Sequence, residues 1–218
     1  MDNDFTLIPE DLQRYAEAHT TPAEPLLERL ERDTHVNVLD PRMLSGAYQG
    51  KLLEMISRMI APLRILEVGT YTGYSAICLA KGLKEGGSLL SIEHNPELED
   101  RIRAYWSEAG LQDKAELRLG EALDILPSLP PASFDLIFLD ADKRNYTLYY
   151  PLLKRLLKAG GWLLADNVLW SGKVLDARFH DKDTQAMCAF NDMVQRDPDT
   201  ENLLLPLRDG ISLVRKVR

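Results

Sequence analysis

From Arg64 onward, short apolar runs alternate with helical segments, and this rhythm constrains the fold more than any other feature. Repeated strand–helix units predict an α/β fold with a doubly wound, mostly parallel sheet. A turn at Asp209-Gly210 predicts a closing hairpin, whose last strand is antiparallel. Gly160-Gly161 is expected to stop a helix. The expected strands of the seven-stranded sheet are 64–69, 88–93, 115–119, 134–140, 162–166, 202–207 and 211–217, and the helices are 74–83, 97–109, 121–126, 146–157 and 183–196.

The first 62 residues carry helical patterns and no strand signals. Residues 9–18 form one expected helix. Thr21-Pro-Ala-Glu24 fits a capping box for a second helix, and 35–41 is expected to be a linker. Leu52, Leu53, Ile56, Met59 and Ile60 form one stripe of a third helix, which spans 46–60 and ends before Pro62. We expect one domain over 1–218, with a helical cap (1–62) on an α/β core (63–218). The cap is interpreted as a lid, a dimer contact or a cover for the sheet.

Charge and composition narrow the partners and the compartment. The formal net charge of −8 argues against a nucleic-acid-binding surface and against attachment to anionic membranes. No segment approaches the roughly 20 apolar residues of a membrane span, and the acidic N-terminus does not resemble a signal peptide. Cys78 and Cys188 provide neither a disulfide framework nor a metal-binding spacing. These features predict a reduced, cytoplasmic protein.

Polar side chains follow two of the expected strands at the points where the strands end. The apolar run from Phe134 ends in Asp140, Asp142 and Lys143, and the run from Trp162 ends in Asp166-Asn167. Parallel strands bind ligands at their carboxyl ends. Carboxylate and amide oxygens suit Mg²⁺, Mn²⁺ or Ca²⁺, and not zinc. The alternatives are a helix-initiating turn for the first group and a loop-initiating Asx pair for the second.

A glycine turn follows the first strand, with Gly69 and Gly73 before a helix. It matches neither a P-loop nor Gly-x-Gly-x-x-Gly. Glu93, 24 residues beyond Gly69, is placed to accept hydrogen bonds from ribose hydroxyls, and residues 120–123 are a natural place for an adenine edge. Glu67 lies inside an apolar strand, where an unpaired charge is costly. A cationic ligand or a buried salt bridge to arginine would relieve that cost.

Several long motifs occur together and in order: 66–75, 134–146, 160–172 and 209–211. With them, the chain from Met43 to its C-terminus resembles the cation-dependent, S-adenosylmethionine-using O-methyltransferases, which include caffeoyl-CoA and catechol O-methyltransferases. The resemblance implies a Rossmann-like class I methyltransferase fold. One departure stands out, because plant CoA-ester enzymes carry a substrate-contacting asparagine where this chain has Ser171.

The resemblance also implies residue roles. Asp140, Asp166 and Asn167 would be catalytic residues that bind the metal, and Lys143 would be the general base. The cofactor-binding residues would be Ser45, Glu67, Gly69, Thr70, Gly73, Ser75, Glu93, Ala122, Asp140 and Asp142.

The expected reaction is the methylation of one hydroxyl on an aromatic ring with two adjacent hydroxyls. The cofactors would be S-adenosylmethionine and a divalent cation, Mg²⁺ or else Mn²⁺ or Ca²⁺. The alternatives are an NAD-dependent oxidoreductase on a similar sheet and a non-catalytic binding module. The expected partner is a small aromatic diol, with no nucleic acid and no membrane, and a homodimer through the N-terminal helices is expected.

Overall fold

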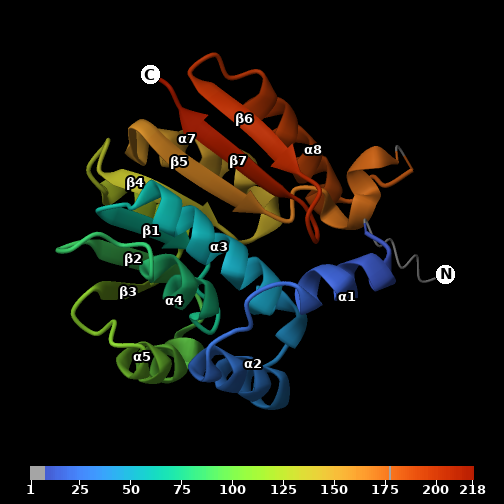
Figure 1. Cartoon of the computed structure of the whole chain (residues 1–218). Helices are drawn as coiled ribbons and strands as arrows, with labels where there is room; N and C mark the ends of the chain where they lie inside the picture. Colours follow the sequence, from blue (N-terminus) through green and yellow to red (C-terminus); the bar gives the residue numbers. More distant parts are fainter. Residues whose placement is uncertain (1–7, 177) are drawn as a thin grey trace.

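The computed structural model describes residues 8–176 and 178–218, so residues 1–7 of the predicted cap lie outside the described part. A seven-stranded sheet forms its centre, in the order β3-β2-β1-β4-β5-β7-β6 (Figure 1). Strands β1 to β5 pair in parallel, whereas β7 runs antiparallel to both β5 and β6. The predicted sheet is confirmed. Its strands are β1 (Arg64–Val68), β2 (Ser88–Glu93), β3 (Ala115–Leu119), β4 (Phe134–Leu139), β5 (Leu157–Asp166), β6 (Thr200–Leu205) and β7 (Ile211–Lys216).

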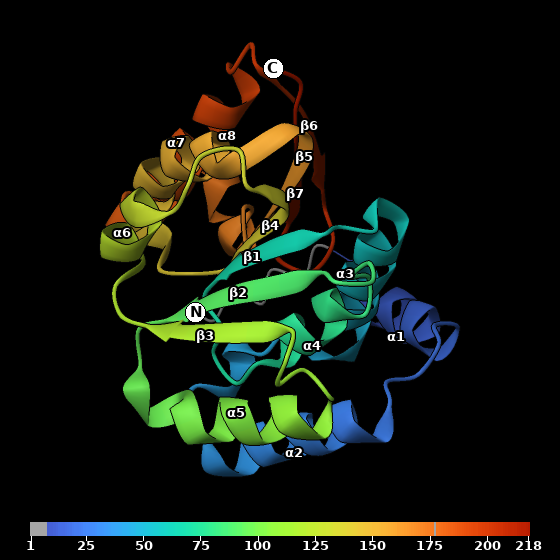
Figure 2. The ribbon, with the colours of Figure 1, turned by 90° about the vertical axis from the view of Figure 1, so that its left-hand side faces the viewer.

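Helices cover both faces of the sheet (Figure 2). Helices α2 to α5 pack on one face and α6 to α8 on the other. The α-helices are α1 (Glu10–Ala18), α2 (Pro25–Asn37), α3 (Gly46–Ile60), α4 (Tyr74–Ala80), α5 (Glu99–Glu108), α6 (Ala122–Ile125), α7 (Tyr146–Leu156) and α8 (Lys182–Gln195). Short 3₁₀ helices are η1 (Pro41–Met43), η2 (Pro96–Leu98), η3 (Leu126–Ser128), η4 (Lys143–Asn145) and η5 (Trp170–Leu175).

Two hydrophobic clusters, one on each face of the sheet, form the core. On β1, Ile65 packs among α3 and α4, while Leu66 and Val68 belong to the opposite cluster with α7 and α8. Side chains alternate between faces along a strand, so a strand covered on both sides needs apolar residues at nearly every position. This explains the nearly unbroken apolar runs of β1 and β4.

The strand order reverses at β1, which pairs with β2 on one side and β4 on the other. Sheets of this kind bind ligands in the crevice outside such a reversal. The chain passes close to itself there: a Cβ added to Gly69 would lie 2.0 Å from the backbone oxygen of Asp140, and the φ of Gly69 is +96°. Only glycine fits this position, which lets the ends of β1 and β4 approach each other.

Three local predictions were wrong. Helix α2 begins at Pro25 with Glu24 as N-cap and no capping side chain, because Pro25 disfavours helical backbone at the residue before it, and Glu24 is extended (ψ 153°). The helix also extends to Asn37, into the predicted linker. Gly160-Gly161 does not stop a helix: Phe134 pairs with Leu157 and Leu136 with Trp162, so the glycines lie in an irregular bulge inside β5, where glycine supplies positive φ.

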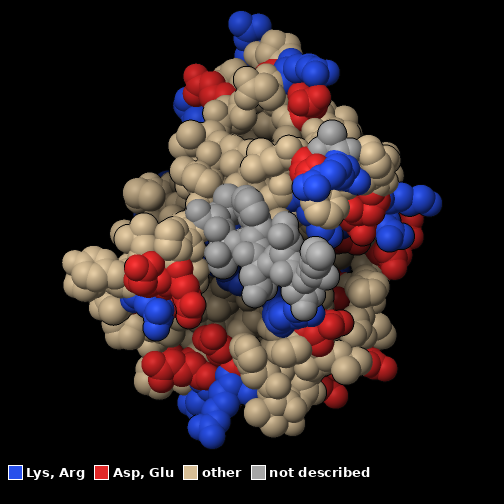
Figure 3. All heavy atoms as spheres, turned by 90° about the vertical axis from the view of Figure 1, so that its right-hand side faces the viewer, with Lys and Arg blue, Asp and Glu red and all other residues tan. Residues whose placement is uncertain are grey.

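Met59, a member of the predicted apolar stripe of α3, faces solvent instead of the core. It is 75% exposed, so the apolar face of α3 is narrower than the sequence pattern predicted. No helix in the described ranges is long and apolar enough to cross a membrane. On the face in Figure 3, Lys and Arg are interspersed with Asp and Glu, without a continuous basic patch among the described residues.

Candidate active site

A cavity of about 970 Å³ opens at the carboxyl ends of β1, β2, β4 and β5. Most of the predicted site residues line it: Ser45, Gly69, Glu93, Ala122, Asp140, Asp142, Lys143, Asp166 and Asn167. The other predicted residues, Glu67, Thr70, Gly73 and Ser75, do not line it. A cavity of this size can hold a nucleoside cofactor together with a small aromatic ring.

The register of β4 and β5 brings two carboxylates together. Leu139 pairs with Ala165, so Asp140, the residue after β4, lies beside Asp166, the last residue of β5. Asn167 follows with a φ of +60°, which asparagine tolerates better than most residues. The predicted metal ligands therefore converge from adjacent strand ends on one cavity.

The surroundings of Asp166 disfavour the ionised form of its carboxyl group. Burial raises the pKa of Asp166 to about 6, and the charge of Asp140 contributes to the rise. The described residues contain no cluster of three or more His, Cys, Asp or Glu suited to a metal. A cation here would therefore take the amide of Asn167 as well as both carboxylates, a set of hard oxygen donors that fits Mg²⁺.

Lys143 lies beside this pair, in the short helix η4. Its Nζ donates to Asp140 Oδ1 at 2.7 Å and to the Tyr146 hydroxyl at 2.9 Å. Burial lowers the pKa of Lys143, but the charges of Asp140 and Asp166 and the hydrogen bond to Asp140 outweigh burial and raise the pKa above its ordinary value. Proton release from this ammonium thus depends on how far the neighbouring carboxylate charges are compensated.

Glu67 is fully buried in β1, and hydroxyl groups surround its carboxyl. Ser75 Oγ donates to Glu67 Oε1 at 2.6 Å, and Ser91 Oγ donates to Oε2. Burial raises the pKa of Glu67 to about 8, although these hydrogen bonds oppose the rise. The hypothesis of a buried salt bridge to arginine was wrong, because no basic side chain among the described residues pairs with Glu67.

Comparisons with known proteins identify the family of the chain. A family model described as "O-methyltransferase" matches residues 17–217. The chain belongs to the O-methyltransferase family. It is 36% identical to mouse catechol O-methyltransferase domain-containing protein 1, over 97% of this chain and 82% of the relative. It is 33% identical to caffeoyl-CoA O-methyltransferase 1 of Eucalyptus globulus, over 94% of this chain and 87% of the relative.

Solved structures agree as well. The O-methyltransferase TomG from Streptomyces achromogenes, in complex with SAM, superposes with a TM-score of 0.85 at 29% identity, over 95% of this chain and 96% of TomG. The fold is that of a Rossmann-like class I methyltransferase. Membership of this enzyme family sets aside the two alternative interpretations, an NAD-dependent oxidoreductase and a non-catalytic binding module.

In this O-methyltransferase, Glu93 at the end of β2 holds the glycine turn in place. Its Oε2 accepts from the backbone N–H groups of Thr70 (3.2 Å) and Tyr71 (2.7 Å), and its Oε1 accepts from Asn95 N (2.9 Å). The carboxylate still lines the cavity. It therefore connects two strand ends in addition to its predicted contact with the cofactor.

Asp142 lines the cavity with its carboxylate held from behind. It accepts from the Tyr149 hydroxyl at 2.5 Å and from Asn145 Nδ2 at 2.6 Å, and it precedes η4 without a side-chain capping bond. Gly73 lies elsewhere: it precedes α4 as the N-cap with a φ of +88°, and a Cβ there would lie 2.6 Å from Trp106 Nε1. The visible role of Gly73 is therefore packing against that tryptophan.

Two residues of the O-methyltransferase site were missed by sequence reasoning. Tyr146 accepts from Lys143 and donates to the backbone oxygen of Asp166 at 3.0 Å, so it joins the ammonium to the end of β5. Ser91 pairs in register with Glu67 across β1 and β2. A signal for Ser91 existed, because two polar residues at one register position of neighbouring buried strands predict a hydrogen bond between them.

Proposed function

We propose that this O-methyltransferase transfers a methyl group from S-adenosylmethionine to one hydroxyl of an aromatic ring with two adjacent hydroxyls, and that it needs a divalent cation. One observation carries the proposal: Asp140, Asp166 and Asn167 meet at the edge of the cavity directly beside Lys143. The names of the mouse and Eucalyptus relatives, which refer to catechol and caffeoyl-CoA, support an acceptor of this class.

The residues present fit a cation. Burial and the proximity of Asp140 raise the pKa of Asp166, so a positive charge between the two carboxylates would stabilise the ionised pair. Asp140, Asp166 and the amide oxygen of Asn167 would hold it. When bound, a divalent cation acts as a Lewis acid that lowers the pKa of a coordinated phenol and as a template for two adjacent oxygens.

Lys143 is proposed to accept the proton of the hydroxyl that becomes methylated. Its Nζ is fixed by Asp140 and Tyr146, at the cavity edge where the acceptor oxygen would lie. A cation held by the carboxylates would compensate their charge, and they would then raise the pKa of Lys143 less. The amine could then act as a base at Nζ. Positioned proton transfer of this kind contributes typically about 10²–10⁴-fold to a rate.

The remaining cavity residues are proposed to orient the cofactor, which supplies an electrophilic methyl group. TomG binds SAM with the same fold. The carboxylate of Glu93 lies where ribose hydroxyls would donate to it, and Ala122 offers a small apolar surface for a base edge. Fixing both reactants in one enclosed cavity converts a bimolecular step into an effectively unimolecular one.

Methyl transfer from labelled S-adenosylmethionine tests the proposal. The enzyme would be assayed with catechol and with phenol, before and after treatment with EDTA, and again after Mg²⁺ is restored. We expect label in catechol, little in phenol, loss of transfer with EDTA and recovery with Mg²⁺. Transfer that survives EDTA would refute the cation requirement, and equal transfer to phenol would refute the two-oxygen template.

A further inference from the structure

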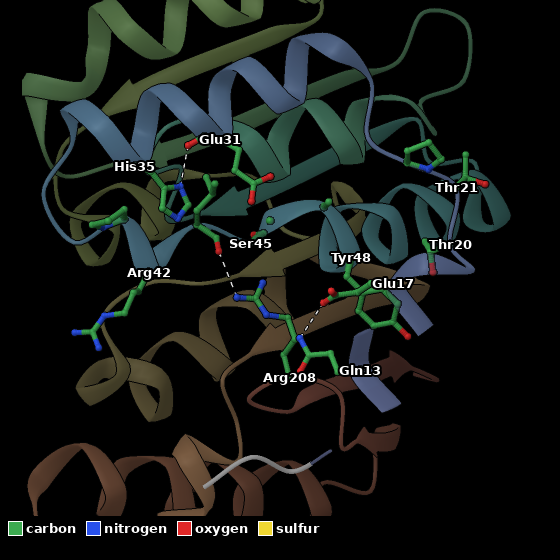
Figure 4. Close-up of a pocket in the computed structure, with 15 residues that line it drawn as sticks. Gln13, Glu17, Thr20, Thr21, Glu31, His35, Arg42, Ser45, Tyr48 and Arg208 are labelled. Atoms are coloured by element: carbon green, nitrogen blue, oxygen red, sulfur yellow. Dashed lines mark hydrogen bonds between the residues drawn. The ribbon is translucent and has the colours of Figure 1, made fainter. Parts of the chain in front are cut away.

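A second cavity, of about 470 Å³, lies between the N-terminal helices and the loop that joins β6 to β7 (Figure 4). Arg208, from that loop, lines both this cavity and the larger one. In Figure 4 its side chain extends toward the chain at Ser45, and its Nη2 donates to the Leu44 backbone oxygen at 3.4 Å. Arg208 thus connects the N-terminal layer with the edge of the active site.

Between Arg208 and the active site lies Gln49 of α3, a polar side chain only 1% exposed. Gln49 Nε2 donates to Asp166 Oδ2 at 2.6 Å, and Gln49 Oε1 accepts from Arg208 Nη1 at 2.9 Å. A guanidinium can only donate, so its contact with Oε1 turns the amide nitrogen of Gln49 toward Asp166. Arg208 therefore determines which end of the Gln49 amide faces the carboxylate.

The loop that carries Arg208 is itself fixed to the chain just beyond the carboxylate. Val168 N donates to the Gly210 oxygen at 3.1 Å, and Leu169 N donates to the Asp209 oxygen at 2.9 Å. Arg208 has a φ of +51°, a backbone conformation that is unfavourable for a residue with a side chain. A strained residue persists where the surrounding contacts hold it. Here those contacts are the hydrogen bonds of its loop to Val168 and Leu169 and its own bond to Gln49, which in turn binds Asp166.

We infer that Gln49 and Arg208 are positioning residues that hold Asp166 in the orientation needed to bind a cation. Each Asp166 oxygen accepts one internal donor, Oδ1 from Asn167 N at 2.8 Å and Oδ2 from Gln49 Nε2. The carboxylate cannot rotate without breaking one of these bonds, and each oxygen keeps another lone pair for a cation. The inference rests on the proposed function, because it presumes that Asp166 is a metal ligand.

Electrostatics alone predicts the opposite effect of Arg208. A guanidinium that is one hydrogen-bonded side chain away from Asp166 also repels a cation bound to that carboxylate. Removing this charge should tighten cation binding if charge is all that matters, and it should weaken binding if the contact with Gln49 is what matters. The sign of the change therefore separates the two explanations.

The experiment is a titration of chelator-treated enzyme with Mn²⁺, in which the EPR signal of the free ion reports binding without any turnover. Gln49→Leu removes the donor at constant charge. Arg208→Gly removes the guanidinium and keeps the left-handed backbone. Arg42→Ala is the matched control, because Arg42 is exposed and lines the same two cavities but makes no hydrogen bond to Gln49 in the described structure. Thermal unfolding of each variant checks that it folds.

We expect Gln49→Leu to bind Mn²⁺ about 10–100-fold more weakly, the usual effect of losing a residue that orients a metal ligand. Arg208→Gly should also bind more weakly, and Arg42→Ala should bind equally or more tightly. Gln49→Leu and Arg208→Gly variants that bind as tightly as the wild type would overturn the inference alone. A wild-type enzyme that binds no Mn²⁺ would overturn the cation requirement, and the inference with it. If Gln49→Leu does not fold, Arg208→Gly decides.

Discussion

The buried carboxyl of Glu67 gives the protein a pH-dependent stability that one substitution should remove. Glu67 is surrounded by the hydroxyls of Ser75 and Ser91, which can accept as well as donate. Glu67→Gln therefore mimics the protonated acid in shape and in hydrogen bonding, without the option of ionising. We expect the variant to fold normally and to differ from the wild type in how its stability varies with pH.

The magnitude follows from the pKa of Glu67, which rises from 4.5 to about 8 on folding, chiefly through burial. Between these values the folded protein keeps the proton and the unfolded chain has lost it, so unfolding releases a proton and rising pH favours unfolding. The stabilisation is fully present below pH 4.5 and is lost as the pH rises to about 8. It changes by about 1.4 kcal/mol per pH unit, on the order of 5 kcal/mol across the window.

Urea unfolding at about pH 6 and about pH 7.5 measures this effect. The stability of Glu67→Gln relative to the wild type should rise by about 2 kcal/mol between the two conditions. Glu116→Gln, an exposed position on the neighbouring strand β3, controls for the loss of one carboxyl elsewhere on the sheet. A constant difference between Glu67→Gln and the wild type at both pH values would show that Glu67 does not hold a proton in the folded protein.

Three further outcomes follow from the site. Lys143→Met should lower kcat by about 10²–10⁴-fold with an unchanged cofactor dissociation constant; an unchanged kcat would remove Lys143 as the base. Asp166→Asn should abolish Mn²⁺ binding in the EPR titration; retained Mn²⁺ binding would contradict its role as a ligand. Gly69→Ala should lower the free energy of unfolding in urea by several kcal/mol, because its Cβ would lie 2.0 Å from the Asp140 oxygen. The control Gly86→Ala, with a φ of +71° and nothing within 4 Å of the added Cβ, should lower it by only about 1–2 kcal/mol. Equal losses of stability would refute the clash.

The sheet and the polar edge of the active site could be predicted because their signals are local. An apolar run that ends abruptly in charge locates the end of a buried strand, and Asp140, Lys143, Asp166 and Asn167 each lie within four residues of such an end. Parallel strands then bring those ends to one edge of the sheet without further information. The ends of the strands are visible in the sequence and lie together in the fold, so these four residues line one cavity.

Contacts that depend on how helices pack could not be predicted in this way. Gln49 meets Asp166 across 117 positions of the chain and Arg208 across 159. Nothing in the sequence near Gln49 distinguishes a polar residue facing the core from one facing solvent. Tyr146 is a similar case, because a tyrosine in the first turn of a helix is usually a packing residue, and only its hydroxyl partners reveal the contact with Lys143.

Local signals also failed where two of them competed. Thr21 fits a capping box, yet α2 starts four residues later at Pro25, because Pro25 disfavours helical backbone at Glu24, which is extended. A pair of glycines fits a helix end, yet Gly160-Gly161 allows a bulge within β5. The start of the helix was decided by the later proline, and the place of the glycines by the pairing of β5 with β4.

Anomalous diffraction from crystals soaked in Mn²⁺ would test the central claim most directly. We predict one anomalous peak bonded to oxygens of Asp140, Asp166 and Asn167, at roughly the 2.0–2.6 Å typical of hard cations with oxygen ligands. A soaked crystal with no peak at this edge of the sheet, or with Mn²⁺ bound only elsewhere, would contradict the assignment of these three side chains as a cation site.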